Sequence, residues 1–545
     1  MSTLPPSFSD SHSLDGKKSE SSSTVDAVQY NKGVDEAIDL VVGHVDDQPL
    51  NPEEARRIRF KIDRVVLPLL FALYTLQFVD KGTLGASSIL GIIQDNKLTA
   101  DEFNTLGSAF YIGYIVFAYP HSWALQRFPV AKYLSANIFL WAVLVGLHCA
   151  CKNFRGLCTY SNVWYTLNLP GSQVVLRFLL GASEGCITNG VMIVTSMFYT
   201  RTEIGERIGW TFQCNGFASI VSGFLAFGVA HADANAKPKR WQLLMIVYTG
   251  LTILIGAWFI LLFPDSPVKA RFLTKDEKVK AVRRVQGNQA GIETKTWKRE
   301  QVIEALKDIK TWLFFLFAAV SNLQNGIGTQ YSLIIKSFGF TTLQTTALNI
   351  PSGAAMIISI TSSTLILRRY PVRCSLPVNE FHLTVAARTP ELGLLLASYY
   401  LGLLCSYYLL NFGAAPSFVM VISWVAVTTS GHTKKLAVNA VFLIGYSLGQ
   451  VLCTQFWKEK YKPRNYVPWS ICLASYVGDF LIILAIRYVL DTENKRRDAL
   501  QASSAHDEYG YVEKADSDGQ IIRQKVDKAM LDLTDRQNLS FRYAL

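Results

Sequence analysis

Long apolar runs separated by short polar segments occupy this sequence from residue 65 almost to its C-terminus. A helix needs about 20 mostly apolar residues to cross roughly 30 Å of hydrocarbon. By this criterion the first half of the chain predicts spans at residues 65–89, 104–125, 133–150, 173–198, 208–230 and 241–263. The second half predicts spans at residues 311–335, 343–367, 436–457 and 467–490. The pattern indicates an all-α membrane protein.

The region between the eighth predicted span and residue 436 is ambiguous. Residues 374–391 contain Pro377, Glu380, Arg388 and Pro390 and cannot cross lipid as a helix. Residues 392–427 are almost continuously apolar, a run too long for one straight span and very short for two. We therefore expect about 12 transmembrane helices, with the ninth irregular or missing.

The order of the spans predicts a domain organisation. Six spans, a charged loop and roughly six more spans are typical of a transporter with two six-helix bundles and a substrate site between them. We expect a disordered N-terminal tail (1–64), an N-terminal bundle (65–263), a central loop (264–310), a C-terminal bundle (311–490) and a C-terminal tail (491–545). Lys and Arg concentrate before the first span and in the central loop, which predicts that both termini and this loop are cytosolic.

Composition supports a membrane protein and argues against other classes. Half of the 545 residues are hydrophobic, only 17% are charged, and the mean hydropathy is +0.21. The net charge of +11 comes without a basic stripe interleaved with aromatic residues, so we expect no nucleic-acid partner. The nine cysteines lack zinc-ligand spacing. We expect no metal, no cofactor and no enzymatic activity.

Ionisable residues within the predicted spans are the first candidates for chemistry, because each costs about 2.5–3.5 kcal/mol on insertion scales. Asp80 and Lys81 are adjacent in the first span. Neighbouring helical residues point about 100° apart, so the two cannot simply neutralise one another. Arg177 and Glu184 lie seven residues apart in the fourth span, on nearly the same face, with Gly181 between them.

These four residues form a hypothetical charge relay. We expect Asp80 and Glu184 to carry protons, and Lys81 and Arg177 to bind an anionic substrate after they leave their carboxylate partners. Gly181 would allow another helix to approach closely. The alternative is a static network of charge pairs that only fixes helix packing.

The seventh span adds a cluster of amide side chains in "SNLQNGIGTQY", namely Asn322, Gln324, Asn325 and Gln330. Such amides can bind a carboxylate or ureido group, and the two glycines permit a bent or broken helix. Hydrogen bonds between helices are an equally good explanation of the amides. Asp479 and Arg487 in the last span have a structural explanation, as an ion pair within one helix or as snorkelling side chains.

Several motifs together resemble one known family. They include "KIDRVVLPLLFALYTLQFVDKGTLG", "VVLRFLLGASEGCIT", "SGHTKKLAVNA" and the terminal "DLTDRQNLSFRYAL". They resemble the fungal allantoate permease group of the anion:cation symporter family, in the major facilitator superfamily. The resemblance implies alternating access and proton-coupled uptake of a small organic anion such as allantoate, ureidosuccinate or nicotinate. It also implies coupling and binding roles for Asp80, Lys81, Arg177 and Glu184.

Two segments depart from the family pattern, residues 158–173 and 374–391. They resemble translated intron or frame-shifted sequence, and we hypothesise an imperfect gene model that sequencing the transcript would test. We expect a monomer in the plasma membrane whose partners are the lipid bilayer, a small organic anion and the proton. The alternative is a nutrient receptor with the same fold that does not transport.

Overall fold

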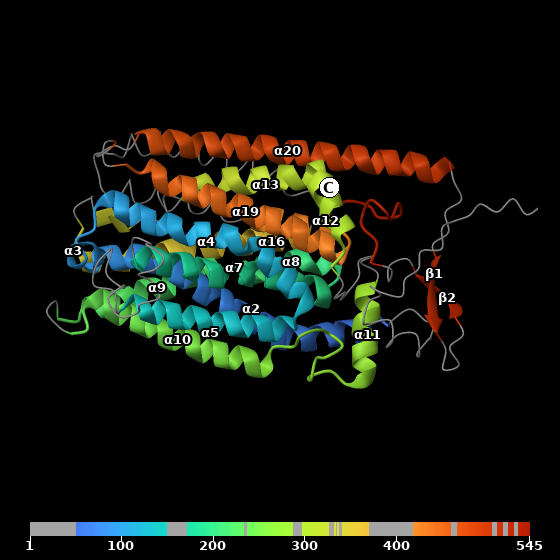
Figure 1. The fold of residues 1–545 in the computed structure, drawn as a ribbon, viewed down its shortest axis with the longest axis horizontal. Coiled ribbons are helices and arrows are strands. Elements are labelled where there is room, and N and C mark those ends of the chain that lie inside the picture. Colours follow the sequence, from blue (N-terminus) through green and yellow to red (C-terminus); the bar gives the residue numbers. More distant parts are fainter. Residues whose placement is uncertain are drawn as a thin grey trace, which may run out of the picture.

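The computed structural model describes residues 51–149, 172–233, 237–286, 297–325, 332–333, 335–336, 340–369, 418–458, 461, 466–503, 509–515, 521–527 and 532–544. Within these residues, long helices lie side by side along the longest axis of the molecule (Figure 1). Seven of the described helices are long and apolar enough to cross a membrane. The architecture is the all-α bundle that the hydropathy pattern predicts.

The first half of the chain forms one group of long helices. Its elements are α2 (Pro52–Ile89), α3 (Ile92–Asp95), α4 (Ala100–Arg127), α5 (Val130–His148), α7 (Ser172–Phe198), α8 (Arg201–Phe212), α9 (Cys214–Ala230) and α10 (Arg240–Leu262). Two short helices follow, α11 (Lys275–Gln286) and α12 (Arg299–Lys307). Figure 1 places α11 and α12 at the opposite end of the molecule from α3.

The second half forms the other group. Its elements are α13 (Ile309–Ser321), the 3₁₀ helix η1 (Asn322–Asn325), α15 (Thr342–Ala347), α16 (Asn349–Arg369), α19 (His432–Phe456) and α20 (Tyr466–Ser503). A shorter apolar helix covers Phe418–Thr428. Strands β1 (Tyr509–Ala515) and β2 (Ile521–Asp527) pair antiparallel, with Tyr509 opposite Asp527. They lie beyond the end that carries α11 and α12 (Figure 1).

Helix α2 begins earlier than the sequence analysis expects. Residues 52–64, which we assigned to a disordered tail, are its first turns. The Asn51 side chain accepts a hydrogen bond from the Glu53 amide and caps the helix, and Pro52 follows at the first helical position. Ile58 and Ile62 are buried in the core. The apolar residues Ile58 and Ile62 within this charged segment therefore pack into the core and extend α2 toward the N-terminus.

The described part of the seventh predicted span changes from an α-helix to a 3₁₀ helix, and its two glycines lie outside the described residues. Helix α13 ends at Ser321, and the four residues of η1 continue it as a 3₁₀ turn. The expected ninth span, residues 158–171 and residues 374–391 lie outside the described residues. The structure therefore does not test the prediction of an irregular or missing ninth span or the hypothesis of an imperfect gene model.

Glycines allow the closest helix contacts. A Cβ added to Gly181 on α7 would come closer than 3.0 Å to the Phe110 carbonyl oxygen, and one on Gly113 of α4 closer than 3.0 Å to that of Phe178. The expected close approach at Gly181 is thus made by α4. Between the two groups of helices, Gly216 of α9 faces Gly353 of α16 in the same way.

The two groups of helices also meet through α4 and α19. Near α12, the Gln126 side chain donates to the Thr433 hydroxyl at 3.0 Å. At the far end of the same pair, the Ser108 and Thr454 hydroxyls lie 2.7 Å apart. Both ends of this interface are therefore in contact in this conformation.

Candidate functional site

Helix α2 carries Asp80 into the interior of the first group of helices. The side chain is only 4% exposed. Its Oδ2 atom accepts a hydrogen bond of 3.0 Å from the indole nitrogen of Trp141, a fully buried residue of α5. Asp80 is thus held by a neutral donor on a neighbouring helix.

Lys81 points in a different direction, as the helical geometry predicts. Its ammonium nitrogen lies 5.1 Å from the ring centre of Phe78, 5.6 Å from that of Tyr114 and 5.4 Å from that of Tyr446. Such distances are typical of cation–π interactions, worth about 0.5–2 kcal/mol each. Tyr114 belongs to α4 and Tyr446 to α19, so Lys81 lies where the two groups of helices meet.

Glu184 is the most deeply buried acid of the predicted relay. It is 0% exposed, and neither carboxylate oxygen has a hydrogen-bond partner among the described residues. On α2, the Gln77 amide donates to the backbone carbonyl oxygen of Glu184 at 3.4 Å. A carboxyl group without a donor in such a site is costly when ionised.

The four predicted residues share one region without direct pairing. Among the described residues, no ion pair of 4.0 Å or less joins Asp80 or Glu184 to Lys81 or Arg177. Arg177, which is 5% exposed, nevertheless interacts electrostatically with both acids, and Glu184 does so with Lys81. The direct charge pairs expected from the sequence are therefore absent among these four residues, and Trp141 contacts Asp80 while aromatic rings surround Lys81.

The amide residues of the seventh span contact other helices of the second group. The Asn322 Oδ1 atom accepts hydrogen bonds from Asn325 at 2.7 Å and from Gln450 of α19 at 3.2 Å. Gln324 donates to Asp479 of α20 at 2.9 Å. This geometry matches the alternative of hydrogen bonds between helices. Gln330 lies outside the described residues.

Asp479 therefore has a different partner from the one that the sequence suggests. It is 5% exposed and makes no ion pair of 4.0 Å or less with Arg487 or another cation among the described residues. Its Oδ1 atom has no hydrogen-bond partner there.

A separate cavity of about 490 Å³ lies between α2, α8 and α10, is lined mainly by apolar side chains, and includes none of the four relay residues.

Comparison with known proteins decides the family. The family model described as Major Facilitator Superfamily matches residues 70–454, which is more than half of the chain. The chain belongs to the Major Facilitator Superfamily.

Relatives within this superfamily are transporters. The chain is 32% identical over 535 residues to the allantoate permease of Saccharomyces cerevisiae, covering 95% of this chain and 91% of the relative. It is 27% identical over 506 residues to the high affinity cysteine transporter of the same yeast, covering 91% and 92% of the two chains. The likeness to the fungal allantoate permease group is thus confirmed, and the protein is a transporter, not an enzyme.

A solved structure gives the same fold. The proton:xylose symporter XylE, bound to 6-bromo-6-deoxy-D-glucose, superposes with a TM-score of 0.58, at 13% identity, over 80% of this chain and 96% of that one. This similarity concerns the fold alone. With its long apolar helices, this major facilitator protein is a multi-pass membrane protein.

Sequence reasoning missed the aromatic partners of the relay residues. Trp141, Tyr114 and Tyr446 contact Asp80 or Lys81, yet each is one aromatic residue among many in the apolar runs. Their spacing along the chain carries no signal, because the contacts join different helices. Only the packing of α2, α4, α5 and α19 identifies them.

Proposed function

We propose that this transporter is a proton-coupled symporter that imports a small organic anion by alternating access. The observation that carries the proposal is the group of four ionisable residues beside the α4–α19 interface: Asp80, Arg177 and Glu184 are buried, and the half-buried Lys81 touches rings from both groups of helices. Allantoate, ureidosuccinate, nicotinate and related carboxylates are the proposed substrates. The allantoate permease relative supports this class of substrate.

Asp80 and Glu184 are the proposed proton carriers. A buried carboxylate binds a proton more readily when its cationic neighbour moves away and releases it when the neighbour returns. Arg177 and Lys81 interact electrostatically with these acids without being locked in ion pairs, so a rearrangement of the helices can change both interactions. This coupling is what symport requires.

Lys81 and Arg177 are the proposed ligands of the substrate anion. Both are cations in an apolar interior, where an anion gains more from a charge than it does in water. We also propose that Asn322, Gln324, Asn325 and Gln330 contribute polar groups from the second bundle. Asn325 is the best placed of the described amides, because its side chain is exposed.

We place the transporter in the plasma membrane with both termini in the cytosol. Arg56, Arg57 and Arg59 on the first turns of α2 lie at the same end of the protein as the basic α11. Lys61 of α2 pairs with Glu277 of α11 at 2.5 Å, which supports a common side for these segments. The positive-inside rule makes that side cytosolic.

The test is uptake of labelled allantoate by cells that have this chain as their only permease. We expect uptake to rise as the external pH is lowered, and Asp80→Asn and Glu184→Gln each to reduce accumulation by at least about tenfold, as expected for the loss of a proton carrier. Asp101→Asn is the matched control, since Asp101 is exposed in the first turn of α4.

Two results would contradict the proposal. Uptake that does not respond to external pH or to a protonophore would exclude proton coupling. Saturable binding without flux in proteoliposomes would favour the alternative of a receptor. If uptake is seen, a growth screen on single nitrogen or vitamin sources would then identify the substrate.

A further inference from the structure

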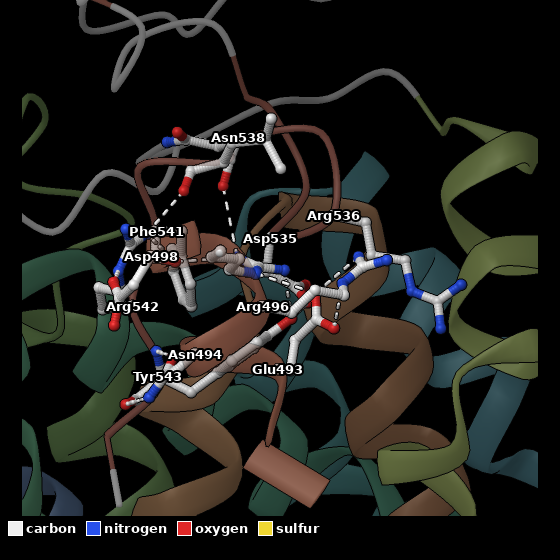
Figure 2. Close-up of polar contacts among 12 residues, drawn as sticks. Glu493, Asn494, Arg496, Asp498, Asp535, Arg536, Asn538, Phe541, Arg542 and Tyr543 are labelled. Carbon is white, nitrogen blue, oxygen red and sulfur yellow. Dashed lines mark hydrogen bonds and ion pairs between the residues drawn. The ribbon is translucent and has the colours of Figure 1, made fainter. Parts of the chain in front are cut away.

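The last described segment of the chain, residues 532–544, docks against the second group of helices. Phe541 and Tyr543 are 1% and 6% exposed and belong to the main hydrophobic core. Asn494 of α20 donates to the Tyr543 carbonyl oxygen and accepts from the Tyr543 amide, both at 2.9 Å (Figure 2). Trp424 donates to the Ala544 carbonyl oxygen at 2.7 Å. We call residues 532–544 the C-terminal clamp.

A buried charge cluster lies under the clamp. Asp535 is 0% exposed and forms ion pairs with Lys310 at 2.5 Å and Lys434 at 2.8 Å. The Tyr543 hydroxyl donates to the same carboxylate at 2.6 Å. Lys310 lies in the first turn of α13 and Lys434 in the first turn of α19, so one clamp carboxylate joins the ends of two helices. Buried ions of this kind are stable only when they are paired.

The clamp also caps α19. The first amide groups of a helix have no partner within the helix and attract negative charge. Asp532 Oδ1 accepts from the His432 amide at 2.7 Å, and Gln301 Oε1 accepts from the Lys434 amide at 3.1 Å. Gln301 in turn donates to the Asp532 carbonyl oxygen at 3.0 Å. The residues on either side of Thr433 are therefore fixed by the clamp and its neighbour α12.

Thr433 is the residue that meets the first group of helices. Its hydroxyl accepts a hydrogen bond from the Gln126 side chain of α4 at 3.0 Å and another from the Lys298 amide at 3.3 Å. Lys298 pairs with Asp532 at 2.8 Å. A continuous chain of contacts thus leads from the clamp to the α4–α19 interface at the proposed cytosolic end.

We propose that the C-terminal clamp positions Thr433 against Gln126 and is required to close the cytosolic side between the two bundles. Asp532 and Asp535 are positioning residues that act through α19, at a distance from the substrate. The clamp makes its described contacts with α12, α13, α19, α20 and the helix Phe418–Thr428. It therefore moves with the second bundle, and Gln126 belongs to the first. This inference rests on the alternating-access cycle proposed above.

The test measures closure at both ends of the α4–α19 interface in the full chain. One reporter carries Gln126→Cys and Thr433→Cys, and the other carries Ser108→Cys and Thr454→Cys, each in a background without native cysteines. We expect Asp535→Asn to lower the rate of cross-linking of the first pair by roughly tenfold, because it takes away one of the two carboxylates, Asp535 and Asp308, that pair with both Lys310 and Lys434. The second pair should cross-link as fast as before, or faster.

Controls separate positioning from folding. Asp491→Asn removes an exposed ion pair with Lys495 on α20 and should leave both reporters unchanged. If Asp535→Asn does not fold, Asp532→Asn provides a milder change, since an amide can still accept from the His432 amide but not pair with Lys298. Asp535→Glu should recover part of the cross-linking at the first pair.

Two outcomes would overturn the inference. Equal cross-linking of the first pair in the Asp535→Asn, Asp532→Asn and unmodified chains would show that the clamp does not position Thr433. A parallel loss at both pairs would show a general role in folding. Both cross-linking rates are measured at one fixed pH without substrate, so failure of proton-coupled uptake would leave them interpretable.

Discussion

Gly181 offers a direct test of the packing that holds the relay residues. It lies on α7 between Arg177 and Glu184, and a Cβ at this position would come closer than 3.0 Å to the carbonyl oxygen and carbon of Phe110 on α4. These are backbone atoms in the middle of a long helix, so no side-chain rotation can relieve the overlap. The substitution Gly181→Ala must push α4 and α7 apart.

The size of the effect follows from two opposing contributions. Extra methyl groups in a packed interior cost about 1–3 kcal/mol. Replacing Gly by Ala within a helix contributes about 0.5–1 kcal/mol of stability through backbone entropy. Because the overlapping atoms belong to the backbone, we expect an overpacking cost near the upper limit of this range. The net loss in the free energy of unfolding is then roughly 2 kcal/mol.

Gly250 is the matched control. It lies within α10, is exposed, and a Cβ there would meet nothing within 4 Å. Gly250→Ala therefore carries only the favourable contribution. Thermal unfolding of the purified proteins in detergent, followed by the loss of the monodisperse peak, should show opposite shifts for the two variants. Uptake should fall for Gly181→Ala, because the displaced α7 carries Arg177 and Glu184.

The result that would refute this reasoning is a Gly181→Ala protein as stable as the Gly250→Ala protein. In that case α4 and α7 would not be in contact at Gly181. The placement of Arg177 and Glu184 relative to α4 would then be wrong as well. A loss of uptake without a loss of stability would instead point to a local effect on the relay.

Three further predictions concern single residues. Tyr446→Leu removes one of the rings that make cation–π contacts with Lys81, and should raise the KM for anion uptake by about two- to thirtyfold. Initial-rate measurements would detect this change, and an unaltered KM would contradict it. Burial raises the pKa of the Asp535 carboxyl, but Lys310 and Lys434 outweigh burial and hold it below its ordinary value. The protection factors of the clamp amides in hydrogen exchange, which are corrected for the base-catalysed intrinsic rate, should therefore stay high above about pH 4 and fall only at lower pH. A loss of protection near neutral pH would contradict this pairing. Asp479→Asn should retain uptake, because an amide oxygen can still accept from Gln324, whereas loss of pH-dependent uptake would make Asp479 a proton carrier.

The four relay residues show which features of a site can be predicted from helix geometry alone. The spacing of Asp80 and Lys81 implies that they face different neighbours, and in the structure Asp80 contacts α5 while Lys81 contacts α4 and α19. The sequence also indicates close packing at Gly181. It could not identify the neighbouring helices, so it predicted ion pairs where the structure has an indole and aromatic rings.

The ends of the chain gave less accurate predictions. Residues 52–64 are polar enough to resemble a tail, yet Ile58 and Ile62 are buried on one face of α2. At the other end, the sequence predicts a polar C-terminal tail that includes "DLTDRQNLSFRYAL" and gives no partner for Asp535, which is completely buried. Composition cannot distinguish a charged residue that is buried beside a partner from one that is exposed to water.

The sequence by itself determined that this protein is a helical membrane transporter with charged residues in its interior. Hydropathy and helical periodicity are local properties, and the cost of placing an ion in a membrane is large enough to mark such residues individually. Only the tertiary structure decided which groups meet: Asp80 with Trp141, Lys81 with Tyr114 and Tyr446, and Asp535 with Lys310 and Lys434. These contacts join segments far apart in the chain, and their partners are set by how helices pack, which no local pattern encodes.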